Sequence, residues 1–474
     1  MNNLVYGVKD RPPFGKIIVF ALQQLLAILA ATIAVPAIIN STPAVIANLG
    51  ESPAMSQSAA LFGAGAGTIV YLLFTRFKSP VFLGSSFAFL GSMVAAFAGA
   101  VTVNVGYLGL IIGAILAGLV YVVFAIIEKF AGSKWIDKIM PAVVIGPTVA
   151  IIGLSLAGNA IGDLSKGGVD STNTYLALVI GIITLFGVII TSVFGKKFMK
   201  LIPFIIGICV GYLVAAIFTG IGIAANNDAL KVIDFGKFKD MQWFPDFAFI
   251  KAFSGFADFQ DAGQFFQFFG TIAVAYVPVA FVVFAEHIAD HKNLSSIIGT
   301  DLTKDPGLHN TLLGDGIGSM AGAFFGGCPN TTYGESIGCV AITKNASVLT
   351  ILVTAFIAIL MSFFAPFVTF LATIPACVMG GVCIALYGFI AVSGLKMIQN
   401  VDLSDNRNLF VVSVILICGV GGLELVFGKV TITKIACALI LGILVNVIVN
   451  IGKKNKTNEL EDTSEALDDN SNNE

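Results

Sequence analysis

The chain has 474 residues, of which 57% are hydrophobic and only 11% are charged, and its formal net charge is −2. Soluble domains carry about 25% charged residues, so these totals exclude a soluble enzyme, and the lack of excess positive charge argues against a nucleic-acid partner. One membrane-spanning helix needs about 20 apolar residues. Most of the length therefore fits into spans, and we expect a polytopic membrane protein in contact with lipid.

Apolar runs recur along the whole chain and predict an all-α fold of membrane spans. The first run lacks the small-residue cleavage context of a signal peptide and is long enough to span, so we expect it to be retained. Two of the runs, 80–98 and 331–343, would make poor uniform helices. The fourteen runs lie near residues 16–37, 57–75, 80–98, 107–127, 139–160, 174–194, 201–221, 269–288, 311–328, 331–343, 347–370, 374–393, 408–427 and 432–451.

The distribution of basic residues tests this count, because cytoplasmic loops carry an excess of lysine and arginine. If the N-terminus is cytoplasmic, most of the 26 basic residues fall in cytoplasmic segments. Four lysines that do not (Lys231, Lys237, Lys239 and Lys251) share one long loop, where charge has little influence on orientation. We therefore predict fourteen spans with both termini in the cytoplasm.

Two segments outside the spans have a distinct composition. Residues 222–267 are rich in aromatic and acidic side chains and form a predicted extracellular linker. This linker fits an interfacial amphipathic helix or, alternatively, a packed cap over a transport site. Residues 453–474 begin with lysines and end in Glu, Asp, Asn and Ser, and this composition predicts a disordered cytoplasmic tail.

Two pairs of similar segments indicate an internal repeat. PVFLGSSFAF begins at residue 80 and PNTTYGESIG at residue 329, and PAVVIG (141–146) resembles PACVMG (375–380). The members of each pair are seven spans apart, and this odd offset makes them cross the membrane in opposite directions. We therefore predict two inverted repeats, 1–221 and 268–452. Interrupted spans at matching positions of inverted repeats point to a transport site near the membrane midplane.

The sequence CPNTTYGESIGCVAITK (328–344) contains the most informative candidate residue, Glu335. Irregular backbone at membrane depth is tolerated only where protein buries it or where it lines a cavity. A carboxylate there can accept hydrogen bonds from the N–H groups of a neutral ligand, and burial favours its protonated form. Both properties suit proton-linked binding of a small heterocycle. The alternatives are an ordinary loop between short spans and a glutamate that caps the following half-helix.

The sequence FAEHIADH (284–291) places Glu286 and Asp290 one helical turn apart. Two acids on one helix face beside histidine could hold or relay a proton, although a solvated cytoplasmic helix end would also explain them. Phe87 could stack on a flat ligand or serve as a core residue. Tyr333 and Tyr387 each offer a ring and a hydroxyl, and either interpretation remains open for them.

Several chemistries have no basis in this sequence. The chain has no phosphate-binding loop and no catalytic triad spacing, so we expect neither an enzyme nor an ATP-driven pump. The seven cysteines lie within or beside apolar runs without metal-type spacing, and we interpret them as small packing residues. We therefore expect no cofactor and no metal site.

The motifs together resemble the nucleobase–ascorbate transporter family of nucleobase:cation symporters, most closely its bacterial uracil-transporting branch. The resemblance covers nearly the whole chain, and its specific motifs are LGSSFAF (83–89), AEHI (285–288), KDPGLH (304–309), PNTTYGESIGCVAITK (329–344) and GGVCIALYG (380–388). It implies seven-plus-seven inverted repeats that form a core and a gate domain, with short antiparallel strands in spans three and ten. It also implies uracil import by proton symport through alternating access, in a homodimer in the bacterial inner membrane.

The resemblance also implies roles for single residues. Glu286 and Glu335 would bond the pyrimidine ring, and the backbone N–H groups of Phe87 and Gly334 would meet its carbonyl groups. The residues that would pack around the ring are Ala31, Phe87, Tyr333 and Tyr387. Glu286 and Asp290 would couple transport to the cation.

Three positions depart from the family pattern. Gln24 stands where the family has histidine, Ser336 where its signature has asparagine, and Asp290 where its uracil branch has histidine. An aspartate at that position could carry a proton or help to bind sodium, so sodium-coupled uptake is an alternative. Others are a xanthine or purine permease of the family, an anion transporter of the same fold, and a channel. Glu335 argues against an anion site, which favours helix N-termini without a facing carboxylate.

Overall fold

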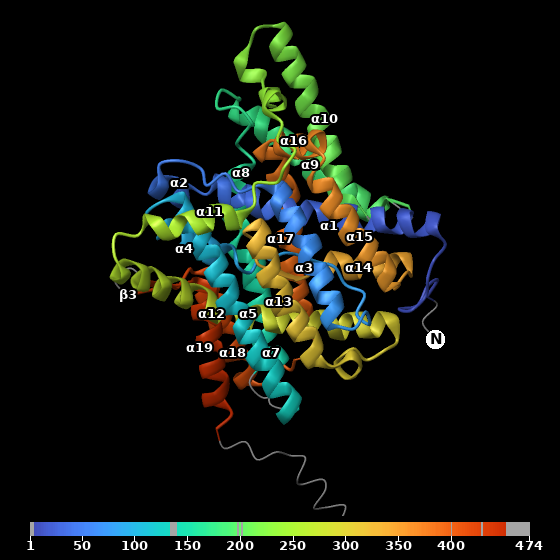
Figure 1. Cartoon of the computed structure of the whole chain (residues 1–474), viewed down its shortest axis with the longest axis vertical. Coiled ribbons are helices and arrows are strands. Elements are labelled where there is room, and N and C mark those ends of the chain that lie inside the picture. Colours follow the sequence, from blue (N-terminus) through green and yellow to red (C-terminus); the bar gives the residue numbers. More distant parts are fainter. Residues whose placement is uncertain are drawn as a thin grey trace, which may run out of the picture.

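The computed structural model describes residues 4–132, 140–196, 199–200, 202–399, 401–427 and 430–451, and the predicted tail at 453–474 lies outside them. The described part is mainly helical, with two pairs of short strands (Figure 1). The elements up to the linker are α1 (Phe14–Ser41), α2 (Pro43–Leu49), α3 (Gln57–Phe74), β1 (Leu83–Ser85), α4 (Leu90–Ala98), α5 (Val103–Ala131), α7 (Ala142–Ser155), α8 (Ala157–Asp163), α9 (Thr174–Phe194) and α10 (Pro203–Ala224).

The linker contains η2 (Asp228–Leu230), η3 (Phe235–Asp240), α11 (Ala248–Gly255) and η4 (Phe256–Asp258). The remaining elements are α12 (Ala262–Ile298), η5 (Thr303–Gly307), α13 (Leu308–Gly326), β2 (Asn330–Thr332), α14 (Gly334–Thr343), α15 (Val348–Ser362), α16 (Ala365–Ala372), α17 (Ala376–Met397), α18 (Asn406–Val420), β3 (Leu425–Phe427), β4 (Val430–Ile432) and α19 (Lys434–Val449).

The lengths and compositions of these helices fit a membrane. In the described residues, eight helices are long and apolar enough to cross one, and α15 with α16 forms a further candidate bent by 82°. Several begin at a side-chain cap, for example α3 at Ser56, α5 at Thr102 and α12 at Asp261. The prediction of a mainly helical, polytopic membrane protein is therefore confirmed.

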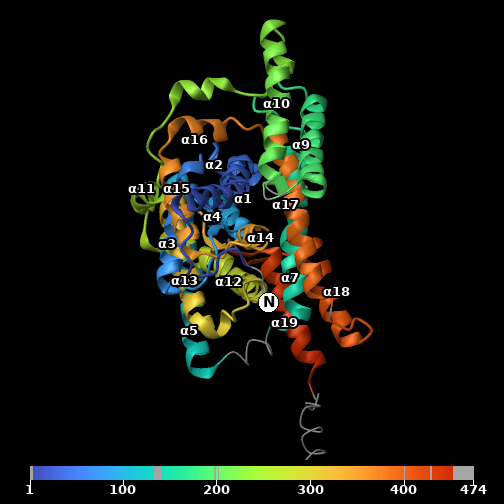
Figure 2. The same cartoon turned by 90° about the vertical axis from the view of Figure 1, so that its right-hand side faces the viewer.

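The helices form two groups that lie side by side (Figure 2). We define the first group as α1, α3, α4, α5, α12, α13, α14 and α15, and the second group as α7, α9, α10, α17, α18 and α19. Helices pack closely within each group, whereas contacts between the groups are sparse and run mainly through α1 and α12. The two groups therefore meet along a seam.

A short antiparallel strand pair lies in the first group, where the sequence interrupts two apolar runs. Strand β1 pairs with β2 so that Gly84 lies opposite Thr331. Backbone bonds continue the ladder at both ends, because Ser86 N donates to Pro329 O (2.9 Å) and Tyr333 N donates to Phe82 O (3.3 Å). The paired strands hydrogen-bond each other's peptide groups, as the prediction of interrupted membrane spans requires.

The approach of the two strands requires glycine at position 84. A β-carbon built there would lie 2.3 Å from Cε2 of Tyr333, well inside van der Waals contact. The Tyr333 ring thus occupies the space that any larger residue at position 84 would need, and its hydroxyl donates to Ser85 O at 2.8 Å. Glycine at this position sets the place of Tyr333.

The linker connects the two groups and packs on both of them. Its first part is fixed to the second group, where Asn173 N donates to Ala229 O (2.8 Å). Its later part lies on the first group through aromatic contacts, such as Phe249 stacked on Phe324 with ring centroids 4.8 Å apart. Among the described side chains of 222–267, none lines the cavity described next.

Candidate functional site

A cavity of about 390 Å³ lies at the seam between the two groups. Its first-group wall comes from α1, α12, β2, α14 and the segment after β1, and its second-group wall comes mainly from α7, α10 and α17. The lining residues used below are Ala27, Phe87, Ala88, Val149, Ile152, Lys200, Pro203, Phe204, Glu286, Ala289, Asp290, Asn293, Thr331, Thr332, Tyr333, Gly334, Glu335, Phe389, Ile390, Ser393 and Met397.

One face of α12 supplies two of the acids. Glu286, Ala289, Asp290 and Asn293 follow the helical repeat and all line the cavity. Asp290 is bonded across to β2, because Thr332 Oγ1 donates to its Oδ2 at 2.7 Å. The two predicted carboxylates on α12 therefore share the cavity, and one of them also holds the strand pair.

The third acid comes from the start of α14. This helix begins at Gly334, directly after β2, and Glu335 lies in its first turn. A β-carbon at Gly334 would meet nothing within 4 Å, so the backbone there borders open space. A helix N-terminus leaves backbone N–H groups without intrahelical partners, and such groups can bind a ligand's carbonyl oxygens. The short helix α4 begins near the cavity in the same way, after Phe87 and Ala88.

Aromatic residues bound the cavity next to these polar groups. Phe87 lines it and packs edge-on against Tyr387, with ring centroids 5.7 Å apart, while Tyr333 lines it from the end of β2. Tyr387 contacts Phe87 but is not among the lining residues. Ala31 is buried in α1 and does not line the cavity either, whereas Ala27, one turn earlier, does. Six of the predicted residues, Phe87, Glu286, Asp290, Tyr333, Gly334 and Glu335, thus meet at one cavity.

Two of the departures from the family pattern contact each other. The Gln24 amide of α1 donates to Ser336 Oγ of α14, which also accepts the N–H of Phe82 at 2.9 Å. Both side chains are buried. The pair therefore fixes the first turn of α14, which carries Glu335, to α1 and to the residue before β1.

We predict that Ser336→Ala lowers both the stability of the protein and the affinity of the cavity for its ligand. The change leaves the buried Phe82 N–H and the Gln24 amide without this acceptor, at a cost of about 1–3 kcal/mol. We expect a lower melting temperature in detergent, measured by thermal shift, and a several-fold weaker affinity for labelled uracil, the ligand that the family resemblance implies. The conservative control, Ser336→Thr, keeps the hydroxyl. An affinity unchanged in Ser336→Ala would contradict a positioning role for this pair.

Some lining residues were not identified from the sequence. Asn293 extends the Glu286–Asp290 face by one turn, and this helical spacing was a usable signal. Thr331 lines the cavity with a hydroxyl that has no hydrogen-bond partner among the described residues. The apolar second-group wall gives no sequence signal, because its residues resemble any lipid-facing or core residue; it consists of Val149, Ile152, Pro203, Phe204, Phe389 and Ile390.

The arrangement suits a small, flat, uncharged ligand. Carboxylates can accept from its N–H groups, free backbone N–H groups can donate to its carbonyls, and aromatic rings can cover its faces. Within the described residues, no group of three or more His, Cys, Asp or Glu could hold a metal ion. These features indicate a binding site for a polar heterocycle.

Comparisons with known proteins find a matching family, similar sequences and a similar fold. Residues 15–426 match the model of a family described as the permease family. The chain is 38% identical to the uracil permease of Bacillus caldolyticus, over 95% of each chain, and 36% identical to that of Bacillus subtilis (strain 168), over 97% of each. Its fold resembles the murine solute carrier 26 family member A9 anion transporter in the inward-facing state, with a TM-score of 0.64 at 11% identity, covering 94% of this chain and 69% of that one.

Proposed function

The chain belongs to the permease family that includes these uracil permeases, and we propose that it imports uracil together with a proton by alternating access. It is a transporter and not an enzyme. The observation that carries the proposal is the placement of three carboxylates beside the ends of the paired strands, in a cavity that two helix groups share. The proposed ligands of the pyrimidine are Glu286, Glu335 and the backbone of Phe87 and Gly334.

The helix packing supports inverted repeats of seven spans. We count β1 with α4 as span three and β2 with α14 as span ten. When each span is replaced by its counterpart seven positions away, two helices that pack together are replaced by two helices that also pack together. The exchanged pairs are α5–α13 with α3–α15, α9–α10 with α18–α19, α9–α17 with α7–α18, and α1–α10 with α12–α19. The pairs α3–α13 and α7–α17 map onto themselves.

The glycines of the second repeated motif pack reciprocally. A β-carbon at Gly146 would lie 2.8 Å from Gly394 O, near the end of α17, and one at Gly380 would lie 2.9 Å from Ala160 O, after the end of α7. Each motif thus contacts the far end of its counterpart, as two antiparallel copies should. This supports repeats at 1–221 and 268–452, joined by the linker at 222–267.

Alternating access needs two bodies that move against each other, and the two helix groups fit that role. The first group holds the acids and the strand pair and corresponds to the proposed core, while the second group supplies the apolar wall of the proposed gate. The cavity extends to Lys200, Asn293 and Met397. In the proposed topology, with both termini cytoplasmic, these residues face the cytoplasm, so the cavity would open inward.

Asp290 and Glu286 are the proposed coupling groups. Both acids face the cavity, and neither their placement nor the bond from Thr332 distinguishes proton from sodium coupling. We propose the proton because a carboxylate that becomes neutral on protonation can cross the membrane at a lower electrostatic cost. We also propose, from the family resemblance, that the protein forms a homodimer in the bacterial inner membrane.

We predict that labelled uracil accumulates in proteoliposomes under an inward proton gradient and not under a sodium gradient alone. Accumulation above the external concentration requires coupling, so it also excludes a channel. Xanthine and thymine serve as competing substrates in the same assay. Uptake driven only by sodium would replace the proposed cation, and xanthine uptake without uracil uptake would shift the proposal to a purine permease.

A further inference from the structure

Two histidines lie on the face of α12 that points away from the cavity. His287 and His291 are fully buried, and their rings stack with centroids 4.0 Å apart. The titratable groups that face them are Tyr71 of α3, Asp315 of α13 and Tyr121 of α5, while α12 itself carries Glu286 and Asp290 on its other side. The proposed transport mechanism assigns no role to these histidines.

His291 belongs to a hydrogen-bonded chain whose hydrogens can adopt two arrangements. Its Nδ1 lies 2.8 Å from His287 O, and since a carbonyl only accepts, this nitrogen carries a hydrogen. Its Nε2 lies 2.7 Å from the Tyr71 hydroxyl, which in turn lies 2.7 Å from Ser79 Oγ. The Tyr71 hydroxyl donates to Ser79, so its oxygen is free to accept from Nε2 when His291 is protonated. In neutral His291, Nε2 carries no hydrogen, and the Tyr71 hydroxyl would turn from Ser79 to donate to Nε2. One added proton therefore turns the Tyr71 hydroxyl back to Ser79 and lets Nε2 donate to Tyr71.

His287 has the same property on its own partners. Its Nδ1 lies 2.7 Å from Asp315 Oδ2, and its Nε2 lies 3.0 Å from Thr311 Oγ1. The Thr311 hydroxyl can donate to this nitrogen or to Leu308 O, also 3.0 Å away. A protonated ring would donate to both partners, and the Asp315 carboxylate would compensate its charge. Both histidines can therefore accept a proton without losing a hydrogen bond.

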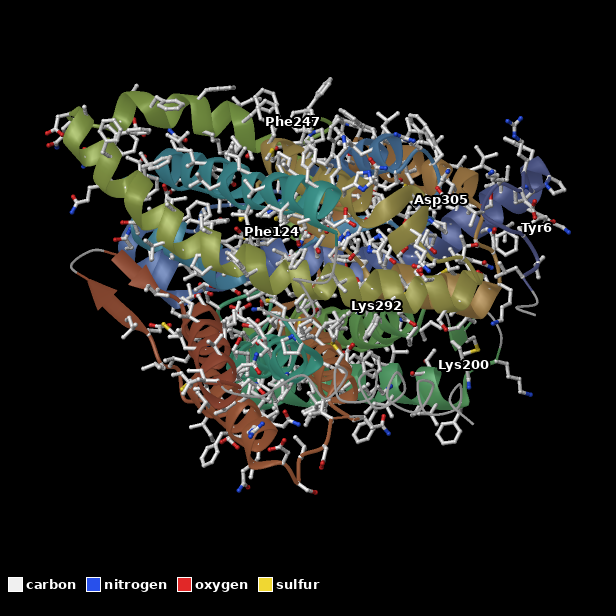
Figure 3. The ribbon with its side chains drawn as sticks, turned by 90° about the horizontal axis from the view of Figure 1, so that it is seen from below. Tyr6, Phe124, Lys200, Phe247, Lys292 and Asp305 are labelled. Atoms are coloured by element: carbon white, nitrogen blue, oxygen red, sulfur yellow. The ribbon has the colours of Figure 1, made fainter. Side chains whose placement is uncertain are left out.

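The His291 chain runs toward one end of the first group. Ser79 follows the end of α3, and the adjacent Lys78 forms an ion pair with Asp305. Figure 3 labels Asp305, which lies in η5, and Lys292, which follows His291 in α12. In the proposed topology this end is cytoplasmic, because Arg76 and Lys78 lie in a cytoplasmic segment.

We propose that Ser79, Tyr71 and His291 form a second proton-binding site, separate from the cavity carboxylates and loaded from the cytoplasmic end. A proton on His291 places a positive charge beside Glu286 and Asp290 on the same helix, and this charge favours their ionised forms. The site therefore assists the carboxylates in releasing their proton when the cytoplasm is acidic. This inference rests on the proposed proton coupling.

The test compares Tyr71→Phe with Tyr121→Phe in right-side-out membrane vesicles. Both tyrosines are buried near the histidines, but the Tyr121 hydroxyl has no hydrogen-bond partner among the described residues. Initial uracil uptake is measured at fixed external pH while the internal pH is lowered. In Tyr71→Phe, protonated His291 loses the hydroxyl that accepts from its Nε2, so the site binds its proton less readily and assists the carboxylates less. We therefore expect uptake to be half-inhibited at an internal proton concentration about tenfold lower than in the parent. Tyr121→Phe should match the parent.

The outcomes separate this inference from the proposed function. If the parent protein shows no uptake driven by a proton gradient, the proposed coupling fails. If the parent responds but Tyr71→Phe keeps its half-inhibitory proton concentration, the second site is wrong, whatever its melting temperature. Should Tyr71→Phe not fold, Ser79→Ala removes the last acceptor of the protonated chain and should shift the midpoint in the same direction. If the midpoint of the variant shifted equally when the external pH was varied instead, loading from the cytoplasm would be contradicted.

Discussion

Replacing Glu335 with glutamine is expected to weaken uracil binding about 100-fold and to abolish uptake at micromolar substrate. The side chain keeps its size, but one carboxylate oxygen becomes an amide that donates where a donor N–H of the base would lie. A hydrogen bond to a charged group contributes about 1.5–3 kcal/mol. Because the amide would turn a donor toward the N–H of the base, we expect the loss of binding free energy to reach the upper end of that range. Equilibrium binding of labelled uracil to the purified protein measures the loss.

The matched control for this change is Glu128→Gln. Glu128 lies at the far end of α5, where it pairs with His309 at 3.2 Å, and does not line the cavity. Its substitution should leave uracil affinity within about twofold of the parent. If Glu335→Gln also retained full affinity with an unchanged melting temperature, Glu335 would be a cap of α14 and not a ligand.

The polar part of the site could be predicted from the sequence because polar and charged residues are energetically costly within an apolar stretch. Pro329, the polar run after it and Glu335 interrupt an apolar stretch, and membrane-depth backbone must then be satisfied by another segment. The second interruption, at Gly84, is the segment that satisfies it, through the pairing of β1 with β2. Glu286 and Asp290 were recognisable in the same way, since two acids one turn apart must share an environment.

Other parts of the site depend on packing that no local pattern encodes. The apolar wall from α7, α10 and α17 consists of residue types that also occur elsewhere in apolar helices. Ala31 was expected at the ligand from the family resemblance, yet in this structure Ala27 borders the cavity, a difference of one helical turn in α1. Such a difference depends on how a long helix is placed against its neighbours, and spacing along the sequence does not report it.

The departures from the family pattern were visible in the sequence, but their relation was not. Gln24 and Ser336 are more than three hundred residues apart, and only the structure shows the amide donating to the hydroxyl. Each looked like an isolated loss of a family residue. Together they form a different polar pair in one place, so the first turn of α14 remains tied to α1. Gln24→His or Ser336→Asn alone should therefore lower stability more than the two substitutions together.

The strand pair also predicts a large effect from a single methyl group. Gly84→Ala is expected to abolish uracil transport, because the added β-carbon would lie 2.3 Å from one Tyr333 ring carbon and 2.4 Å from the next. Tyr333 would have to leave its position, lose its bond to Ser85 O and move the adjacent Gly334 and Glu335. Overpacking of this kind costs about 1–3 kcal/mol in stability, which a protein of this size can survive, so folded protein without uracil binding should be recovered.

Gly91→Ala is the control for that change. It lies in α4, a few residues further along the same segment, and a β-carbon there would have its nearest neighbour at an ordinary 3.8 Å. Size-exclusion profiles, melting temperatures and labelled-uracil binding should therefore stay near the parent values in Gly91→Ala. The contrast between two identical chemical changes isolates the position of Tyr333 as the cause. Normal uracil affinity in Gly84→Ala would mean that the strand ends need not hold this geometry for the base to bind.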